Sequence, residues 1–167
     1  MSLVTLSVQK ALPSDRLALL RMLELYQHDL SDIWDQELDA QGEYGFSLDR
    51  YWQDPHCQAF VARMHGHYAG FALVDGATKV ASAGLWMDQF FVLKKYRRAG
   101  IGKAVARHVF AAVPGHWEVG QMTENQAAQR FWRRVIGEHT GGAYTEHVLS
   151  TGWWQGVVQC FDSSSAA

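Results

Sequence analysis

The chain of 167 residues is long enough for one domain with a substantial core. Its 48% hydrophobic and 19% charged residues are typical of a soluble globular protein, and no apolar run is long enough to span a membrane. The formal net charge is −2, and the basic residues form one local cluster rather than a long stripe, which argues against a nucleic-acid partner.

The cysteines, the histidines and the N-terminus bear on compartment and metal binding. Cys57 and Cys160 are the only cysteines and lack metal-type spacing, so we expect reduced thiols in a cytoplasmic protein. Residues 1–3 do not begin a signal peptide. The eight histidines are scattered and form no ligand set, so we expect no metal site.

The first half of the chain predicts a strand, a helix, a loop and a hairpin. Alternating residues predict a strand over residues 3–9, and Ser14 is suited to cap a helix with a leucine-rich face. The acidic segment of residues 31–51 predicts a loop with short helical pieces. Residues 58–64 and 68–74 then predict two strands joined by a tight turn.

The next stretch contains a buried strand, a basic turn and a helix. Residues 85–93 are apolar at both parities, which predicts a strand covered on both faces. The turn that follows contains Gly100 and Gly102 and leads into a helix with an apolar stripe. The start of a helix has unpaired N–H groups and the positive end of the helix dipole, which predicts a phosphate or diphosphate site. The basic side chains around it are Lys94, Lys95, Arg97, Arg98 and Lys103.

The remaining elements complete a mixed sheet. Residues 116–122 predict a strand that runs parallel to the buried strand through a strand–helix–strand crossover. Residues 123–126 match a capping box, and the helix that they open is expected to end at Gly137. Residues 143–149 and 153–161 predict two closing strands, and we expect the tryptophan pair of the second strand in the core.

The phosphate-binding turn fits one of three known patterns. It lacks the Ser or Thr that follows Gly-Lys in a P-loop and the third Gly or Ala of the dinucleotide fingerprint. Residues 97–102 (RRAGIG) instead resemble the [RQ]-x-x-G-x-[GA] loop of the GNAT superfamily, the acetyl-CoA-dependent N-acetyltransferases. Residues 125–132 (NQAAQRFW) resemble the N-x-x-A-x-x-[FY]-Y helix of the same family. The alternative is an ordinary strand–helix turn with incidental basic residues.

The resemblance implies a fold, a donor and a set of binding residues. The fold is a GNAT-like α/β domain over residues 1–162, with a central mixed sheet of about seven strands and helices on both faces; residues 163–167 are expected to form a disordered tail. The donor is acetyl-CoA, with its diphosphate on the turn and its pantetheine arm hydrogen-bonded to Asn125. The residues assigned to it are Phe91, Val92, Arg97, Arg98, Ala99, Gly100, Ile101, Gly102, Lys103, Asn125 and Trp132.

The catalytic assignments are less direct. The last residue of the family's helix motif is commonly a tyrosine that protonates the departing thiolate, but here it is Trp132, whose indole is not a practical acid. Tyr144 is a candidate for that role, and solvent is the alternative. Acceptor amines must also lose a proton, and Asp88 is the best-placed base because an apolar strand should raise its pKa. The other candidates for this base are Glu118, Glu43 and Tyr26.

Two functions follow. The first is an N-acetyltransferase that acts on a primary amine by direct attack in a ternary complex; the second is a non-catalytic acyl-CoA-binding module. Nine of the seventeen acidic residues lie between Glu24 and Asp54. If this segment borders the acceptor, a cationic small molecule or a protein amino group is expected. The sequence predicts no membrane partner and is compatible with a homodimer.

Overall fold

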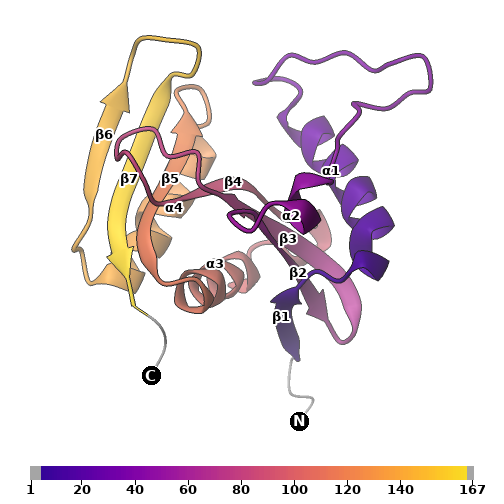
Figure 1. The fold of residues 1–167 in the computed structure, drawn as a ribbon, viewed down its shortest axis with the longest axis horizontal. Helices are drawn as coiled ribbons and strands as arrows, with labels where there is room; N and C mark the ends of the chain where they lie inside the picture. The colour runs from indigo at the N-terminus through magenta and orange to yellow at the C-terminus, as the bar shows by residue number, and fades with distance from the viewer. Residues whose placement is uncertain (1–4, 165–167) are drawn as a thin grey trace.

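Seven strands form one mixed sheet in the computed structural model, which describes residues 5–164 (Figure 1). The strand order is β1-β2-β3-β4-β5-β7-β6. The strands are β1 (Leu6–Lys10), β2 (Gln58–Met64), β3 (His67–Asp75), β4 (Leu85–Val92), β5 (Gly115–Met122), β6 (Thr145–Leu149) and β7 (Gly156–Ser163). The helices are α1 (Arg16–Leu30), α2 (Arg50–Gln53), α3 (Ile101–Ala112) and α4 (Gln126–Thr140), with 3-10 turns η1 (Pro13–Asp15) and η2 (Lys94–Tyr96). The predicted fold class is confirmed.

Helices cover both faces of this sheet. Successive residues of a strand point to opposite faces, so neighbouring residues of β2 pack against different helices. Phe60 and Ala62 of β2 belong to a core cluster that contains Phe110 of α3. Their neighbours in the chain pack in a second cluster with α1; one of them, Val61, lies in the same cluster as Leu23. The apolar residues at both parities of the central strands are therefore explained by two layers of helices.

The sheet opens between its two parallel strands. β4 pairs with β5 only at Leu85–Trp117 and Trp86–Glu118. Beyond Trp86, β4 continues along β3, while β5 continues along β7 as far as Met122. Figure 1 shows the two halves of the sheet diverging from this short contact. The divergence exposes the edges of two strands that are otherwise interior.

Several predicted boundaries change. The predicted end of α4 at Gly137 is wrong, because the helix continues to Thr140 and ends at Gly141, whose φ of 61° suits a glycine cap. The predicted tail begins at Ser163, but this residue lies in β7 and its hydroxyl donates to the Phe110 carbonyl at 2.9 Å. Residues 3–4 of the predicted first strand and residues 165–167 of the predicted tail lie outside the described residues.

Two general expectations can be compared with residues 5–164. Cys57 and Cys160 are both buried and free. In this part of the chain, no helix combines the length and the apolar character that a membrane span requires.

Candidate functional site

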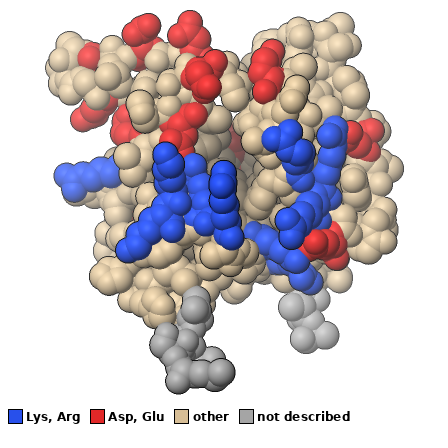
Figure 2. Space-filling view, turned by 180° about the vertical axis from the view of Figure 1, so that it is seen from behind, with Lys and Arg blue, Asp and Glu red and all other residues tan. Residues whose placement is uncertain are grey.

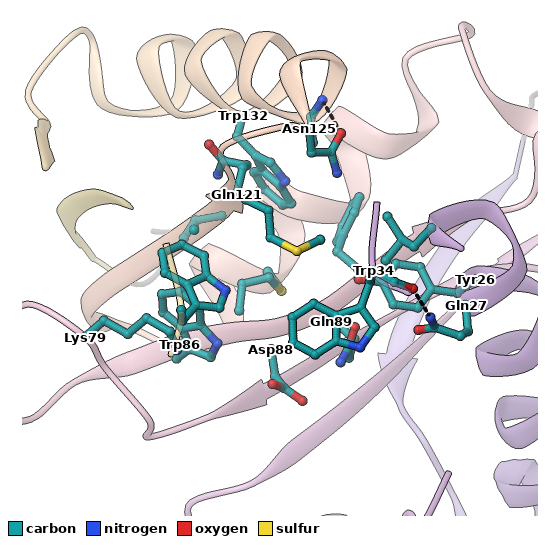
Figure 3. Close-up of a pocket in the computed structure, with 18 of the residues that line it drawn as sticks. Tyr26, Gln27, Trp34, Lys79, Trp86, Asp88, Gln89, Gln121, Asn125 and Trp132 are labelled. Carbon is teal, nitrogen blue, oxygen red and sulfur yellow. Dashed lines mark hydrogen bonds between the residues drawn. The ribbon is translucent and has the colours of Figure 1, made fainter. Parts of the chain in front are cut away.

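A cavity of about 360 Å³ lies where β4 and β5 separate (Figure 3). Its floor is β4, and its walls come from β5, the start of α4, α1 with the loop after it, and the segments around Lys79 and Trp153. In Figure 3, Asn125 and Trp132 lie on the α4 side, while Tyr26 and Trp34 lie on the α1 side. The cavity therefore joins segments that are far apart in the sequence.

Backbone amides of β4 face this opening. The Leu93 N–H donates to the Ala69 carbonyl at 2.8 Å, and N–H directions alternate along an antiparallel strand. The Phe91 amide therefore points to β3, whereas the amides of Phe90 and Val92 point to the gap. The sequence predicted free amides at Phe91 and Val92, whereas in the structure the free amides are those of Phe90 and Val92. The Phe91 side chain instead belongs to the core cluster on the α1 side.

The turn before α3 leaves several amides without helical partners. Gly100 is the N-cap, with a φ of 78° and no side-chain cap. The first bond of the helix joins the Ala104 N–H to the Gly100 carbonyl, so the amides of Ile101, Gly102 and Lys103 lack a helical acceptor. A Cβ at Gly102 would lie 3.2 Å from the Phe131 ring, so this glycine also lets α3 pack against α4.

The basic residues of the turn have different roles. The Arg97 Nε donates to the Val92 carbonyl at 2.7 Å, and its guanidinium pairs with Asp29. Lys103 pairs with Glu138 of α4. Arg98 is exposed, has a φ of 66° and has no ion pair with any residue of the described chain. Figure 2 shows Lys and Arg side chains gathered across the middle of one face, largely below a group of Asp and Glu side chains.

Asn125 and Trp132 both line the cavity. The Asn125 Oδ1 accepts from the Ala128 N–H at 3.2 Å, so Asn125 caps α4 in place of the predicted capping box at residues 123–126. Its Nδ2 has no acceptor among the described residues and remains a donor. Trp132 is buried, and its ring centroid lies 4.8 Å from that of Phe90.

Asp88 is the predicted base that lies at the cavity. Its Oδ2 accepts from the Arg50 Nη2 at 2.8 Å and from the Tyr51 hydroxyl at 2.9 Å. Burial raises the pKa of Asp88, and the nearby Asp75 charge adds to the rise. The Tyr51 hydrogen bond and the Arg50 and Lys79 charges only partly oppose this rise in pKa. A carboxylate with a raised pKa at a cavity is suited to accept a proton. Sequence reasoning missed Arg50 and Tyr51, which come from the segment predicted as a loop.

Glu118 has a different environment. Its carboxylate is fully buried and accepts the backbone N–H groups of Lys79 at 2.6 Å, Val80 at 3.0 Å and Ala81 at 2.7 Å. Burial alone would raise the pKa of Glu118, but these hydrogen bonds outweigh it and the pKa is lowered. A carboxylate held in this way anchors the loop between β3 and β4, and the geometry does not favour it as a base.

The other catalytic candidates either do not line the cavity or line it in a protonation state that does not suit a base. Tyr144 lines a separate cavity of about 430 Å³ beside β6 and β7 and does not line the cavity that Trp132 borders. Tyr26 does line the first cavity, but burial and the Asp88 charge raise its pKa, so the phenol stays protonated. Glu43 is exposed and is not part of the lining.

A caged lysine was missed by sequence reasoning. The Lys79 Nζ lies 3.7 Å from the Trp86 ring centroid, 5.4 Å from that of Trp153 and 5.3 Å from that of Trp154. Trp153 is 82% exposed, so its predicted place in the core is wrong. Among the described residues that line the cavity, Lys79 and Asp88 are the charged ones. The signal that could have found this cage was the clustering of tryptophans near the chain's end, but the contact depends on the fold.

The acidic segment has mostly structural partners. The Glu24 carboxylate accepts the backbone N–H groups of Tyr44 at 2.8 Å and Gly45 at 3.2 Å. Asp29 pairs with Arg97. In residues 5–164, no carboxylate between positions 24 and 54 lines the cavity. The segment contributes aromatic and amide side chains to it instead.

Residues 19–137 match the family model of the acetyltransferase (GNAT) family. This is more than half of the chain, and the chain therefore belongs to the GNAT acetyltransferase family and is an acyltransferase. No curated protein matches it by sequence.

Solved structures show the same fold at low sequence identity. An acetyltransferase from Thermus thermophilus superimposes with a TM-score of 0.67 at 17% identity, covering 97% of this chain and 99% of that one. The protein yncA from Salmonella typhimurium, solved with its cofactor acetyl-CoA, gives a TM-score of 0.63 at 13% identity, covering 94% and 93%. The paia N-acetyltransferase from Thermoplasma acidophilum, in complex with coenzyme A, gives 0.59 at 12%, covering 93% and 98%.

Proposed function

We propose that this protein is an N-acetyltransferase that transfers the acetyl group of acetyl-CoA to a primary amine, by direct attack in a ternary complex. The observation that carries the proposal is the gap between β4 and β5. Free backbone amides of Phe90 and Val92 face it, Asn125 borders it, and Asp88 lies on its floor. Two proteins of the same fold are known with acetyl-CoA and with coenzyme A.

The residues present fit the donor. The three free amides at the start of α3 and the unpaired Arg98 suit a diphosphate, because amides and a helix dipole favour an anion there. The open space above Gly100, where an added Cβ would meet no atom within 4 Å, leaves room for it. The free Nδ2 of Asn125 suits an amide oxygen of the pantetheine arm. The full proposed binding set is Phe90, Val92, Arg98, Ala99, Gly100, Ile101, Gly102, Lys103, Asn125 and Trp132, with Arg97 and Phe91 supporting it through the turn and the core.

Acyl transfer needs an oxyanion donor and a base. The Phe90 amide supplies a fixed N–H for the carbonyl oxygen, where negative charge develops during attack. Asp88 accepts a proton from the ammonium group of the acceptor, so that the neutral amine attacks the thioester carbonyl, and Arg50 and Tyr51 hold the Asp88 carboxylate in place. Trp132 supplies no proton to the departing thiolate, so solvent does so.

The acceptor is proposed to be a small molecule with one primary amine and an aromatic or apolar body. Asp88 is the one carboxylate among the described residues that line the cavity, and the rest of the lining is rich in indole and phenyl rings. The expectation of a cationic small molecule or a protein amino group depends on the acidic segment, whose carboxylates lie outside the lining. We further propose that the protein acts in the cytoplasm, which the two free cysteines support.

The test is thiol release from acetyl-CoA over a panel of amines, with calorimetry of acetyl-CoA binding on the same preparation. Turnover with a monoamine that has an aromatic body, and little with polyamines, is the expected result. Binding without turnover on any amine would support the alternative, an acyl-CoA-binding module without catalytic activity. Absence of binding would overturn both functions.

A further inference from the structure

Four side chains with metal-binding chemistry come together on β5 and β7, outside the cavity described above. His116 and Glu118 are two residues apart on β5, and Cys160 and Asp162 are two apart on β7. The strand register places Glu118 opposite Cys160 and His116 opposite Asp162. Residues two apart on a strand share a face, so all four lie on one side of the sheet.

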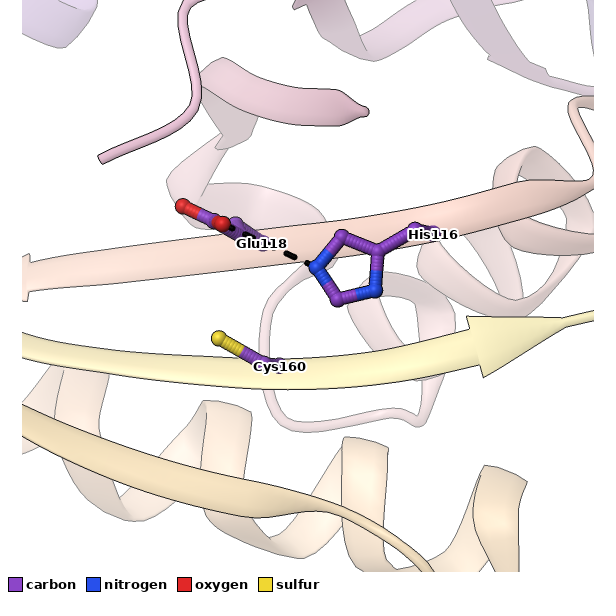
Figure 4. Close-up of side chains that lie close together, drawn as sticks. All are labelled: His116, Glu118 and Cys160. Atoms are coloured by element: carbon purple, nitrogen blue, oxygen red, sulfur yellow. Dashed lines mark ion pairs between the residues drawn. The ribbon is translucent and has the colours of Figure 1, made fainter. Parts of the chain in front are cut away.

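A hydrogen bond to Asp162 orients the His116 ring. The His116 Nδ1 lies 3.3 Å from the Asp162 Oδ1 and donates its proton there. In the neutral imidazole with this tautomer the Nε2 carries the lone pair, and the Nε2 is buried without a hydrogen-bond partner among the described residues. It faces the Glu118 Oε2 at 3.7 Å, which is too long for a hydrogen bond. Figure 4 shows the imidazole nitrogen, the carboxylate and the Cys160 sulfur close together.

These distances suit a shared cation. A nitrogen and an oxygen that bind one tetrahedral zinc ion at about 2.0–2.2 Å are about 3.3–3.6 Å apart, and the 3.7 Å between Nε2 and Oε2 is slightly longer than this. The Cys160 sulfur completes a set whose atoms all lie within 4.8 Å of one another. A shift of about 1 Å would bring all three to one ion.

Glu118 retains a lone pair for this role. Its Oε1 accepts two backbone N–H groups, from Lys79 and Val80, while its Oε2 accepts one, from Ala81. Metal-binding carboxylates are commonly hydrogen-bonded in this way, and a carboxylate that orients a ligating histidine, as Asp162 does here, is a recurrent feature of zinc sites.

We propose that His116 Nε2, Glu118 Oε2 and Cys160 Sγ bind a zinc-like divalent cation, with Asp162 orienting the histidine. An imidazole, a carboxylate and a thiolate together favour zinc over magnesium or calcium. On binding, the thiol releases its proton to solvent and the sulfur–metal bond forms; the fourth position is open to water. The opening beside His116, which is about one-third exposed, gives access to the site. The sequence offered no such signal, because the four residues form two short pairs on strands that are neighbours in the sheet but far apart in the sequence.

The test is titration of the full chain with cobalt(II) chloride, followed by thiolate-to-cobalt charge-transfer absorption, and then displacement by zinc. One equivalent of cobalt should saturate the signal. Cys160→Ser should abolish it, and His116→Asn should lower the affinity at least tenfold. Cys57→Ser is the matched control, since Cys57 is also buried and free but packs in another cluster, and it should bind as the wild type does.

A second variant keeps the test independent of folding. The Asp162 side chain is 90% exposed, so Asp162→Asn should fold normally and should weaken cobalt binding by about 10- to 100-fold. Absence of the charge-transfer signal in the wild-type protein would overturn the proposal. So would a signal that survives Cys160→Ser or disappears in Cys57→Ser, or an unchanged affinity in Asp162→Asn.

Discussion

Asp88 and Glu118 show how partners decide what a buried carboxylate does. Glu118 accepts three backbone N–H groups, which lower its pKa despite complete burial. Asp88 accepts two side-chain donors on one oxygen and lies near the Asp75 charge, and its pKa is raised. The first carboxylate is therefore suited to anchor a loop, and the second to exchange a proton.

Replacement of Asp88 tests this at the level of one residue. Asp88→Asn should lower kcat by roughly 10²- to 10⁴-fold and leave acetyl-CoA affinity unchanged, because it removes the proton acceptor alone. A base works only when deprotonated, so wild-type activity should fall as the pH drops through the raised pKa of Asp88. The pH profile of kcat measures both effects.

Asp75→Asn is the matched control. Asp75 also binds Arg50, at 3.0 Å, but it does not line the cavity. The Asp75 charge raises the pKa of Asp88. The variant should therefore stay active, and the fall of its kcat in acid should move to lower pH. If the kcat of Asp88→Asn falls in acid at the same pH as that of the wild type, the base is another group.

At the scale of elements, the turn before α3 divides its work between two adjacent arginines. Arg97 ties the turn to β4 through the Val92 carbonyl and to α1 through Asp29. Arg98 is left exposed, with a φ of 66° that few non-glycine residues adopt. Arg97 therefore shapes the turn, and Arg98 is the side chain available to an anion.

Charge reversal at Arg98 should weaken acetyl-CoA binding by about tenfold, because one charge-assisted contact to phosphate becomes repulsive. Titration calorimetry measures this, and the loss should shrink as salt rises. Arg21→Glu on α1 is the control, since Arg21 is exposed and distant in sequence from the turn. Equal affinities of Arg98→Glu and the wild type would remove the diphosphate from this turn.

Asn125 combines two roles that substitutions can separate. Asn125→Asp keeps an oxygen to cap the Ala128 N–H but loses the Nδ2 donor, so stability should hold while acetyl-CoA affinity falls. Asn125→Ala loses both and should also lower the free energy of unfolding by about 1 kcal/mol. Thermal unfolding and calorimetry on both variants measure the two effects. If Asn125→Asp binds acetyl-CoA as tightly as the wild type, the residue is only a cap.

At the scale of the whole molecule, local patterns predicted most elements but not the contacts between them. The strand predicted at residues 58–64 is β2 with the same bounds, because alternation and a tight turn define it locally. The end of α4 was misplaced because Gly137 and Gly141 are chemically equal, and only the fold decides which adopts a positive φ.

The same distinction, between local patterns and contacts made by the fold, applies to the residues of the site. The turn at residues 97–102 and Asn125 were predicted because their motifs are contiguous. The cage around Lys79 was not, because it depends on the position of a loop that Glu118 anchors across the sheet. Arg50 and Tyr51 reach Asp88 from 38 and 37 residues away for the same reason.

A partly buried hydrogen-bond network joins the start of the chain to the sheet. Asp15 accepts from the Leu12 N–H at 2.8 Å, Arg63 at 2.5 Å and Tyr68 at 2.6 Å, which joins η1 to β2 and β3. Burial would raise the pKa of Asp15, but the hydrogen bonds from Tyr68, Leu12 and Arg63 outweigh it and the pKa is lowered. The ionised carboxylate therefore stabilises the folded state at neutral pH, and this stabilisation is lost as the pH falls through the lowered pKa.

Asp15→Asn should lower the free energy of unfolding by about 1–3 kcal/mol at neutral pH, and the difference from the wild type should shrink in acid. Urea unfolding at several pH values measures this. Asp35→Asn, at an exposed position, is the control and should match the wild type. A constant difference across the pH range would show that the charge of Asp15 is not responsible.

The short contact between β4 and β5 has a consequence for hydrogen exchange. Phe90 and Val92 belong to a strand in the middle of the sheet, yet their N–H groups should exchange with solvent deuterium as quickly as those of an outer strand. The N–H of Phe91, which lies between them in the chain and is bonded to β3, should be protected from exchange. Saturation with coenzyme A should slow Phe90 and Val92 selectively, so that the bound molecule takes the place of the missing neighbouring strand.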